Sequence, residues 1–371
     1  MLRKFSVSNF KCFEKRTTFD LSDPANYSFN QAVIHDKTKT KGIVYGANGS
    51  GKSNLALALF DIILHLTDKE RILQRYFPYL CLNSQNPVAE FEYEFSFNGV
   101  PVVYRYGKSD PLTLTYEQLL IGGREVLQYD FESRSGVIAL AGAESLALSS
   151  ELPAETDRLS RVKYVKNNAM LQDSEANRAF VSFTTFVDNM LMFYSLDERG
   201  YQGLSVGPDS FTQGIIREGK IEEFRQFLEG QGILYDLVSV DVNGSPELYC
   251  KYDGGVVPFG LVASTGTKSL ALYFYWYIKM SKASLVFIDE FDAFYHFELA
   301  RAIVEMIRGL ESVQVFLSTH NTDLLSNDLL RPDAYFIIQD GNIQSLDKLT
   351  GKELRLAHNL QKMFKAGSFN V

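Results

Sequence analysis

The chain has 371 residues, of which 46% are hydrophobic and 22% are charged. That composition allows two or three units of ordinary domain size and excludes a largely disordered protein. The formal net charge of −8 excludes a surface that is basic throughout. A local basic groove for nucleic acid stays open, because net charge does not report how charge is distributed.

The first part of the chain predicts a strand, a glycine loop and a helix. Strands are expected over residues 2–10, 18–21 and 41–45. The last of these runs into a glycine-rich loop, and apolar residues at helical spacing then predict a helix over 53–66. Strand, loop and helix in this order are the context that a phosphate-binding loop requires.

The middle of the chain has a different pattern. Strict alternation over residues 88–97 reaches Asn98-Gly99 and predicts a hairpin with 102–106. Strand-like runs continue over 112–116 and 126–131, and residues 152–196 and 215–228 are predicted to be helical. Asn243-Gly244 predicts a second hairpin, and three late strands are expected over 284–288, 313–318 and 334–338.

This order of elements predicts an α/β fold in which a mixed sheet has flanking helices. The glycine loop lies near the start of the chain and the motifs that would complete its site lie near the end. One nucleotide-binding head with a long insertion explains this separation better than two independent domains. We assign residues 1–66 and 231–371 to the two halves of the head, and 67–230 to an insertion of antiparallel strands followed by helices.

The cysteines and apolar runs indicate a compartment. Cys12, Cys81 and Cys250 lie far apart in no metal or redox spacing, which is typical of reduced thiols. The first ten residues contain no signal-peptide core. The longest strongly apolar run, 270–278, is about half the length that crosses a bilayer. We therefore expect a cytoplasmic protein with no membrane partner.

The glycine loop matches the pattern G-x-x-x-x-G-K-[ST] in full. In this motif backbone N–H groups curl around the β-phosphate, the lysine reaches the β- and γ-phosphates, and the hydroxyl binds Mg²⁺. An accidental glycine-rich turn is the alternative, which the strand before the loop and the helix after it disfavour. The residues predicted to bind ATP here are Gly46, Ala47, Asn48, Gly49, Ser50, Gly51, Lys52, Ser53 and Asn54, with Ser53 also a ligand of Mg²⁺.

A second motif is an apolar strand that ends in Asp289 and Glu290. Four apolar residues in a row predict a strand that is buried on both faces. Asp289 is expected to hold Mg²⁺, and Glu290 is placed to polarise the water that attacks ATP. An apolar strand followed by Asp-Glu is common on its own, and it gains weight here because it follows a phosphate-binding loop.

A third motif is the strand over 313–318 followed by Thr319 and His320. A histidine at a strand end is usually structural. His320 ends a strand where a γ-phosphate would lie, so we favour a phosphate contact. His35, His65 and His358 show no such pattern.

A fourth motif, residues 263–270, begins an aromatic-rich helix. Ser264 is a helix cap, and Gly266 at the start of a helix makes an anion site. Lys268 in the first turn opposes the helix dipole, which makes more sense if a phosphate binds beside it. An ordinary capped helix is the alternative.

Together these motifs resemble the ABC-type ATPase superfamily, and within it the RecF/SMC/OLD-like branch. Residues 5–13 look like the opening strand of that branch, and 263–270 resemble the SMC signature L-S-G-G-E-K-S-L. Residues 289–296 are similar to the Walker B motif and D-loop, with Asp292 as the D-loop carboxylate. Residues 318–325 and 358–369 resemble the histidine switch and the C-terminal segment of standalone OLD-like ATPases.

The resemblance implies a head-to-tail homodimer, or a higher even oligomer, with two ATP molecules at the interface. In such a dimer Ser264, Gly266, Lys268 and Asp292 of one head complete the ATP site of the other. Thr265 stands in place of the first signature glycine, which implies slow turnover, and Gln85 is the best candidate for the Q-loop glutamine. We see no heptad runs for coiled-coil arms, and we expect no Toprim nuclease, because the chain ends soon after the head.

Three functions compete at this point. The favoured one is a sensor or scaffold ATPase of a bacterial phage-defence or toxin-like system, which works with a separately encoded nuclease or toxin as effector. The second is a RecF-like DNA-repair ATPase whose ATP-closed dimer clamps DNA. A transporter subunit is the third, and the long insertion and Lys268 do not suit it.

Overall fold

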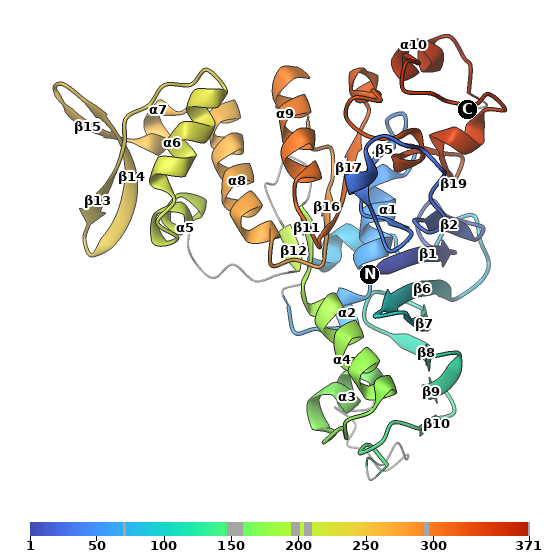
Figure 1. Ribbon diagram of the computed structural model, residues 1–371. Coiled ribbons are helices and arrows are strands. Elements are labelled where there is room, and N and C mark those ends of the chain that lie inside the picture. Colours follow the sequence, from blue (N-terminus) through green and yellow to red (C-terminus); the bar gives the residue numbers. More distant parts are fainter. Residues whose placement is uncertain are drawn as a thin grey trace.

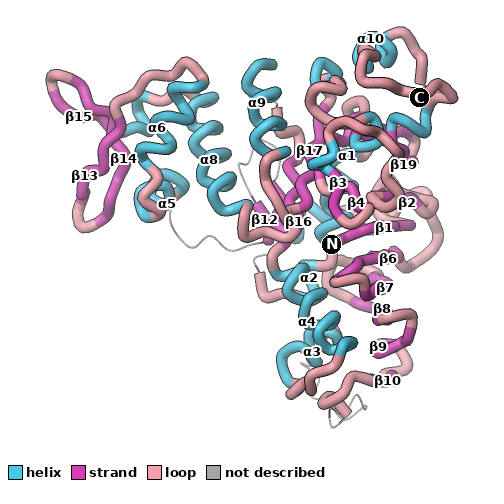
Figure 2. Tube along the Cα trace, viewed as in Figure 1, coloured by secondary structure: helices cyan, strands magenta, loops and turns pink. Residues whose placement is uncertain are grey.

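The computed structural model describes residues 1–69, 72–144, 146, 159–193, 201–203, 210–292 and 297–369. Two seven-stranded sheets dominate it, and Figures 1 and 2 show them next to each other. The first sheet is antiparallel throughout. Its order is β10 (Ser135–Ile138), β9 (Arg124–Asp130), β8 (Leu114–Ile121), β7 (Val100–Lys108), β6 (Ala89–Phe97), β1 (Leu2–Ser8) and β2 (Thr17–Asp20).

The second sheet has five parallel strands between two antiparallel edge strands. Its order is β12 (Tyr201–Gly203), β11 (Met190–Phe193), β16 (Leu285–Ile288), β17 (Gln314–Thr319), β5 (Lys41–Tyr45), β18 (Tyr335–Gln339) and β19 (Asn342–Ser345). All five residues of β5 are buried, as expected for a strand with both faces covered. The predicted α/β class with a mixed sheet is confirmed.

Helices cover the parallel sheet on both faces. α1 (Lys52–Phe60) lies between the two sheets and shares one apolar core with α2 (Ile63–Leu66), α3 (Arg161–Asn168) and α4 (Glu175–Asp188). A second core on the other face contains side chains from α5 (Phe211–Arg217), α6 (Ile221–Gly230), α7 (Phe259–Val262), α8 (Thr265–Met280), α9 (Phe297–Arg308) and α10 (Leu360–Lys365). No helix of the described residues is long and apolar enough to span a membrane.

Smaller elements complete the fold. A three-stranded antiparallel sheet of β13 (Leu237–Val242), β14 (Ser245–Tyr252) and β15 (Gly255–Pro258) stands at the left of Figure 1, beside α6 and α7. The short pair β3 (Ile34–His35) and β4 (Thr38–Lys39) precedes β5. Five 3-10 helices lie in the connections: η1 (Gln31–Val33), η2 (Leu73–Tyr76), η3 (Thr322–Leu324), η4 (Pro332–Ala334) and η5 (Leu346–Leu349).

Three predicted helices differ from the structure. The one predicted over 215–228 is divided, because α5 ends at Arg217 and α6 begins at Ile221. The single helix predicted over 53–66 is interrupted after Phe60, and α2 continues the chain from Ile63. Of the helical run predicted over 152–196, residues 152–158 and 194–196 lie outside the described residues. The rest forms α3, α4 and the strand β11, because a short, fully apolar run such as 190–193 fits a buried strand as well as a helix.

Each of the two sheets contains strands from both the predicted head and the predicted insertion. β6 pairs with β1 in one sheet, and β11 pairs with β16 in the other. The side chain of Gln314 joins the two sheets, because it accepts from the backbone N–H of Leu2 at 2.7 Å and donates to the carbonyl of Leu2 at 2.8 Å. The assignment of 67–230 as an insertion therefore remains a proposal about the sequence.

Candidate nucleotide site

The phosphate-binding loop connects β5 to α1, as predicted. Gly51 precedes α1 with φ 107°, and Gly49 has φ 79°, both in the left-handed region that favours glycine. At Gly46 an added Cβ would lie 2.2 Å from Ser50 Oγ and 2.8 Å from the carbonyl oxygen of Ile338, so only glycine fits this close approach. The loop thus leaves the first N–H groups of α1 in the place where a helix binds anions.

Lys52 now makes its hydrogen bonds within the loop. Its side chain is only 4% exposed, and Nζ donates to the carbonyl oxygens of Gly46 at 2.9 Å and Ala47 at 3.2 Å. Ser53 is exposed, and the side-chain amide of Asn54 donates to Cys12 Sγ at 3.2 Å. Among the described residues the ammonium has no acidic partner, and its two hydrogen bonds hold it at the loop.

The two acidic residues of the second motif lie at the end of β16. Only β17 separates β16 from β5, so the carboxyl ends of these strands share one edge with the phosphate loop. Ser318 Oγ, on β17, donates to Asp289 Oδ1 and accepts from the backbone N–H of Glu290 at 2.8 Å. One buried hydroxyl therefore holds both residues of the motif.

Glu290 has an unusual backbone. Its φ is 44°, a left-handed conformation that costs a residue other than glycine on the order of 1 kcal/mol. Two hydrogen bonds oppose relaxation: the bond of Glu290 N–H to Ser318 Oγ, and the bond of Phe291 N–H to the Ser318 carbonyl at 3.1 Å. Strain held in this way is typical of functional sites.

Thr319, which precedes His320, links Asp292 to Asn321. Thr319 Oγ1 donates to Asp292 Oδ1 at 2.7 Å and accepts from the N–H of Asn321 at 2.9 Å. Asp292 is 8% exposed and faces its own chain, so its contact with a second head remains a prediction. The remainder of the D-loop stretch, residues 293–296, lies outside the described residues.

His320 is exposed and shares a cleft with the phosphate loop. The cleft has a volume of about 640 Å³ and is lined by the first half of the loop, by His320 and Thr322, by the end of β18 and by Phe364. Lys52 and Ser53 are not among the described residues that line it. The structure thus brings His320 to the loop, as predicted from the strand pattern.

The signature motif lies elsewhere. Ser264 caps α8, since its Oγ accepts from the N–H of Thr267 at 3.1 Å. Ser264 is exposed, and Gly266 and Lys268 are partly exposed. None of these three is among the described residues that line the cleft, and the start of α8, beside α7, points away from α1 in Figure 1. Their role as phosphate contacts of a second head remains a prediction.

Sequence reasoning assigned no role to Phe364 and Tyr45, which line the cleft. Phe364, on α10, lies opposite the phosphate loop. Tyr45, the last residue of β5, is 2% exposed, and its hydroxyl has no hydrogen-bond partner among the described residues. The resemblance of residues 358–369 to a known C-terminal segment was the available signal for Phe364. Gln85 is exposed and is not among the described residues of the cleft.

α10 is tied to the loop that follows His320. Asp323 Oδ1 accepts from Gln361 Nε2 and from Lys365 Nζ, the latter at 3.3 Å. Leu360, at the start of α10, is fully buried in the second core. The C-terminal helix therefore supports one wall of the candidate site.

The sequence matches a known protein family. Residues 43–326 match the family model described as "AAA domain, putative AbiEii toxin, Type IV TA system". No curated protein matches the sequence.

Three solved structures are remotely similar, with TM-scores below 0.5. A SMC head bound to the C-winged helix domain of ScpA is 17% identical, with a TM-score of 0.45 over 94% of this chain and 98% of that one. The SMC head domain from Thermotoga maritima is 14% identical, with a TM-score of 0.41 over 92% and 97%. A Smc head with an extended coiled coil, bound to a ScpA domain derived from Pyrococcus furiosus, is 14% identical, with a TM-score of 0.45 over 94% and 97%.

The family model spans more than half of the chain and contains the phosphate loop, the signature motif, Asp289, Glu290 and His320. The chain therefore belongs to this AAA-domain family, which confirms the predicted ABC-type P-loop ATPase fold.

Proposed function

We propose that this protein binds and hydrolyses ATP, and that two heads close around ATP in a dimer. The observation that supports the proposal is that the motifs lie in two separate places on the head. The phosphate loop, Asp289, Glu290 and His320 lie at one edge of the parallel sheet, whereas the start of α8 lies apart from them. A second copy that presents its α8 would complete a site that one head leaves open.

The residues of the loop suit the triphosphate of ATP. The N–H groups at the start of α1 and the ammonium of Lys52 supply positive charge where the β- and γ-phosphates would bind. Ser53 and Asp289 are the oxygen donors that would hold Mg²⁺ together with phosphate oxygens. When bound, Mg²⁺ neutralises charge on the β- and γ-phosphates.

Hydrolysis is assigned to Glu290 and His320. The Glu290 carboxylate would orient the attacking water, and His320 would contact the γ-phosphate from the neighbouring strand end. The hydrogen bond between the N–H of Glu290 and Ser318 Oγ fixes the backbone of Glu290. Thr265, in place of a signature glycine, favours slow turnover.

A mixing experiment tests the shared site. Lys52→Ala should abolish ATP binding, whereas Gly266→Asp should leave binding nearly intact and block closure by steric clash and by repulsion of the γ-phosphate. Hydrolysis by a mixture of the two inactive chains would come from one intact composite site in each mixed dimer. Normal hydrolysis by a monomeric Gly266→Asp variant would show that the two-headed arrangement is wrong.

The wider role we propose is that of a sensor or scaffold ATPase in a phage-defence or toxin-like system. The match to a family described as a toxin of type IV toxin–antitoxin systems supports this reading. A separately encoded nuclease or toxin would then be the effector. Purification with the product of the neighbouring gene, with and without ATP, tests for it: a stable complex of fixed stoichiometry is expected. Purification of this chain alone in both conditions would contradict the proposal.

A further inference from the structure

The body of α1 contains only apolar side chains. From Leu55 to Phe60 every residue is buried, and the side chains of these residues belong to one apolar core with side chains of both sheets. Apolar packing is non-directional, whereas a hydrogen bond depends steeply on distance and angle. The position of α1 along its axis and its rotation about that axis therefore depend on the polar residues at its ends.

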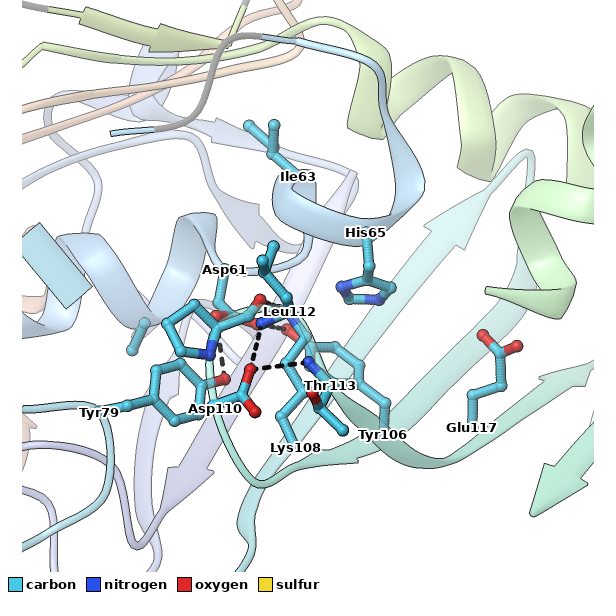
Figure 3. A network of polar contacts seen from close by, with 12 residues as sticks. Asp61, Ile63, His65, Tyr79, Tyr106, Lys108, Asp110, Leu112, Thr113 and Glu117 are labelled. Carbon is cyan, nitrogen blue, oxygen red and sulfur yellow. Dashed lines mark hydrogen bonds and ion pairs between the residues drawn. The ribbon is translucent and has the colours of Figure 1, made fainter. Parts of the chain in front are cut away.

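The end of α1 carries such a polar group. Asp61, directly after Phe60, is fully buried. One carboxylate oxygen accepts from Lys108 Nζ at 2.7 Å and from the hydroxyl of Tyr106 at 3.0 Å, and the other accepts from the hydroxyl of Tyr79 at 3.0 Å (Figure 3). Burial raises the pKa of Asp61, and the ion pair with Lys108 opposes that rise.

The last carbonyl groups of α1 are held by the same sheet. The hydroxyl of Tyr93, on β6, lies 3.1 Å from the carbonyl oxygen of Ala58 and 3.2 Å from that of Leu59. It also lies 3.3 Å from the hydroxyl of Tyr106. The Ala58 carbonyl also accepts from the N–H of Asp61 at 3.2 Å, and the Tyr93 hydroxyl adds hydrogen bonds that fix the last turn of α1 to β6 and, through Tyr106, to β7.

Stability alone does not account for these groups. The side chains of Asp61 and Lys108 are both 0% exposed, and a buried ion pair of this kind is often no more stabilising than apolar residues of similar size. An apolar pair would form no directional hydrogen bonds. The Asp61 carboxylate accepts from three donors, two on β7 and one in a loop, and it has only one place in which all three bonds form.

We infer that Asp61, Lys108, Tyr79, Tyr93 and Tyr106 form a positioning cluster, which sets where α1 presents its first N–H groups to the phosphates of ATP. The inference rests on the proposed function, since it concerns the same nucleotide site. α1 has nine residues and is therefore about 13.5 Å long. Because the helix is short and rigid, a displacement of its end moves its start by a similar distance. Binding sites tolerate positional errors of only about 0.5 Å.

A matched control lies two residues away on the same strand. Tyr104 points to the same face of β7 as Tyr106 and is equally buried. Its hydroxyl lies 2.9 Å from Glu117 Oε2 and 2.9 Å from His65 Nε2. Among the described residues no hydrogen bond joins that hydroxyl to α1. Loss of either hydroxyl removes one buried partner of a carboxylate, but only Tyr106 bonds to Asp61.

The experiment compares Tyr106→Phe, Tyr93→Phe and Tyr104→Phe in the full chain. The dissociation constant for ATP with Mg²⁺ is measured by calorimetry, kcat by phosphate release, and Tm by thermal unfolding. Tyr106→Phe and Tyr93→Phe should raise the dissociation constant at least about threefold and leave kcat unchanged, because Glu290 and His320 lie on other elements. Tyr104→Phe should lower Tm by a similar amount and leave the dissociation constant within about twofold of the parental value.

The outcomes separate the inference from the proposed function. Equal dissociation constants for Tyr106→Phe and Tyr104→Phe, whether unchanged or raised together, would show that the cluster serves stability alone and would overturn the inference. A change in kcat without a change in affinity would overturn it as well. A parental protein that fails to bind ATP would overturn the proposed function, and the inference with it.

Discussion

Replacing Ser318 with alanine tests the link between the geometry of the site and its chemistry. The Ser318 side chain is fully buried and bonds to both Asp289 and Glu290. A hydrogen bond to a charged group contributes about 1.5–3 kcal/mol and a neutral one about 1 kcal/mol. We therefore expect Ser318→Ala to lower the free energy of unfolding by about 2–4 kcal/mol.

The effect on hydrolysis follows from the backbone of Glu290. Without the Ser318 hydroxyl, Glu290 loses a bond of about 1 kcal/mol, and relaxation from φ 44° releases strain of about 1 kcal/mol. Neither form of the variant has that bond, so the relaxed form is favoured by the strain alone, about 1 kcal/mol, and kcat should fall about fivefold.

Urea unfolding and phosphate release at saturating ATP and Mg²⁺ measure the two effects separately. Ser284→Ala is the control, because it removes a hydroxyl that donates to the carbonyl of Phe186 at the opposite end of β16. That variant should lose stability and keep kcat. Hydrolysis at the parental rate by Ser318→Ala would refute the role of Glu290 in the chemistry.

Three further outcomes are expected. Glu290→Gln should keep ATP bound, slow hydrolysis at least about a hundredfold and accumulate a dimer on size-exclusion chromatography; a parental rate would move the role to another residue. Burial lowers the pKa of Lys41 to about 8, so the unfolded state binds more protons above that pH. The stability of the parental chain relative to Lys41→Met should therefore rise by about 2 kcal/mol between about pH 7.5 and 9.5, as followed by urea unfolding, and a constant difference would contradict the shift. Lys365→Met removes the ion pair with Asp323 and should lower kcat about two- to fivefold. The control Lys362→Met removes no ion pair among the described residues and should leave kcat unchanged. Equal kcat values for the two variants would exclude a role for this ion pair.

Local patterns made the phosphate loop and the late motifs predictable. β5, the glycine loop and the start of α1 are contiguous in sequence, and their geometry follows from the glycines and from the buried strand. Asp289 and His320 each end an apolar strand, and parallel strands bring such ends to one edge of a sheet. Ser264 was predictable as a cap because its hydroxyl bonds to a residue three positions ahead.

The features that sequence reasoning missed depend on contacts between distant residues. Asp61 lay within a predicted helix, and its partner Lys108 comes from a strand 47 residues later, so no periodicity relates them. The left-handed backbone of Glu290 depends on Ser318, which is distant in sequence. Contacts of the signature motif with a second head stay predictions, because they lie between molecules.

The position of β11 restricts how the middle of this chain can be exchanged between relatives. β11 pairs in register with β16, and the carbonyl of Phe193 accepts from the N–H of Asp289 at 3.1 Å. A chimera with a foreign segment in place of residues 67–230 would therefore replace the strand that borders Asp289. A junction placed before Met190 retains that strand. Recombination that varies the middle of the chain and preserves an active site should therefore leave its breakpoint between α4 and β11.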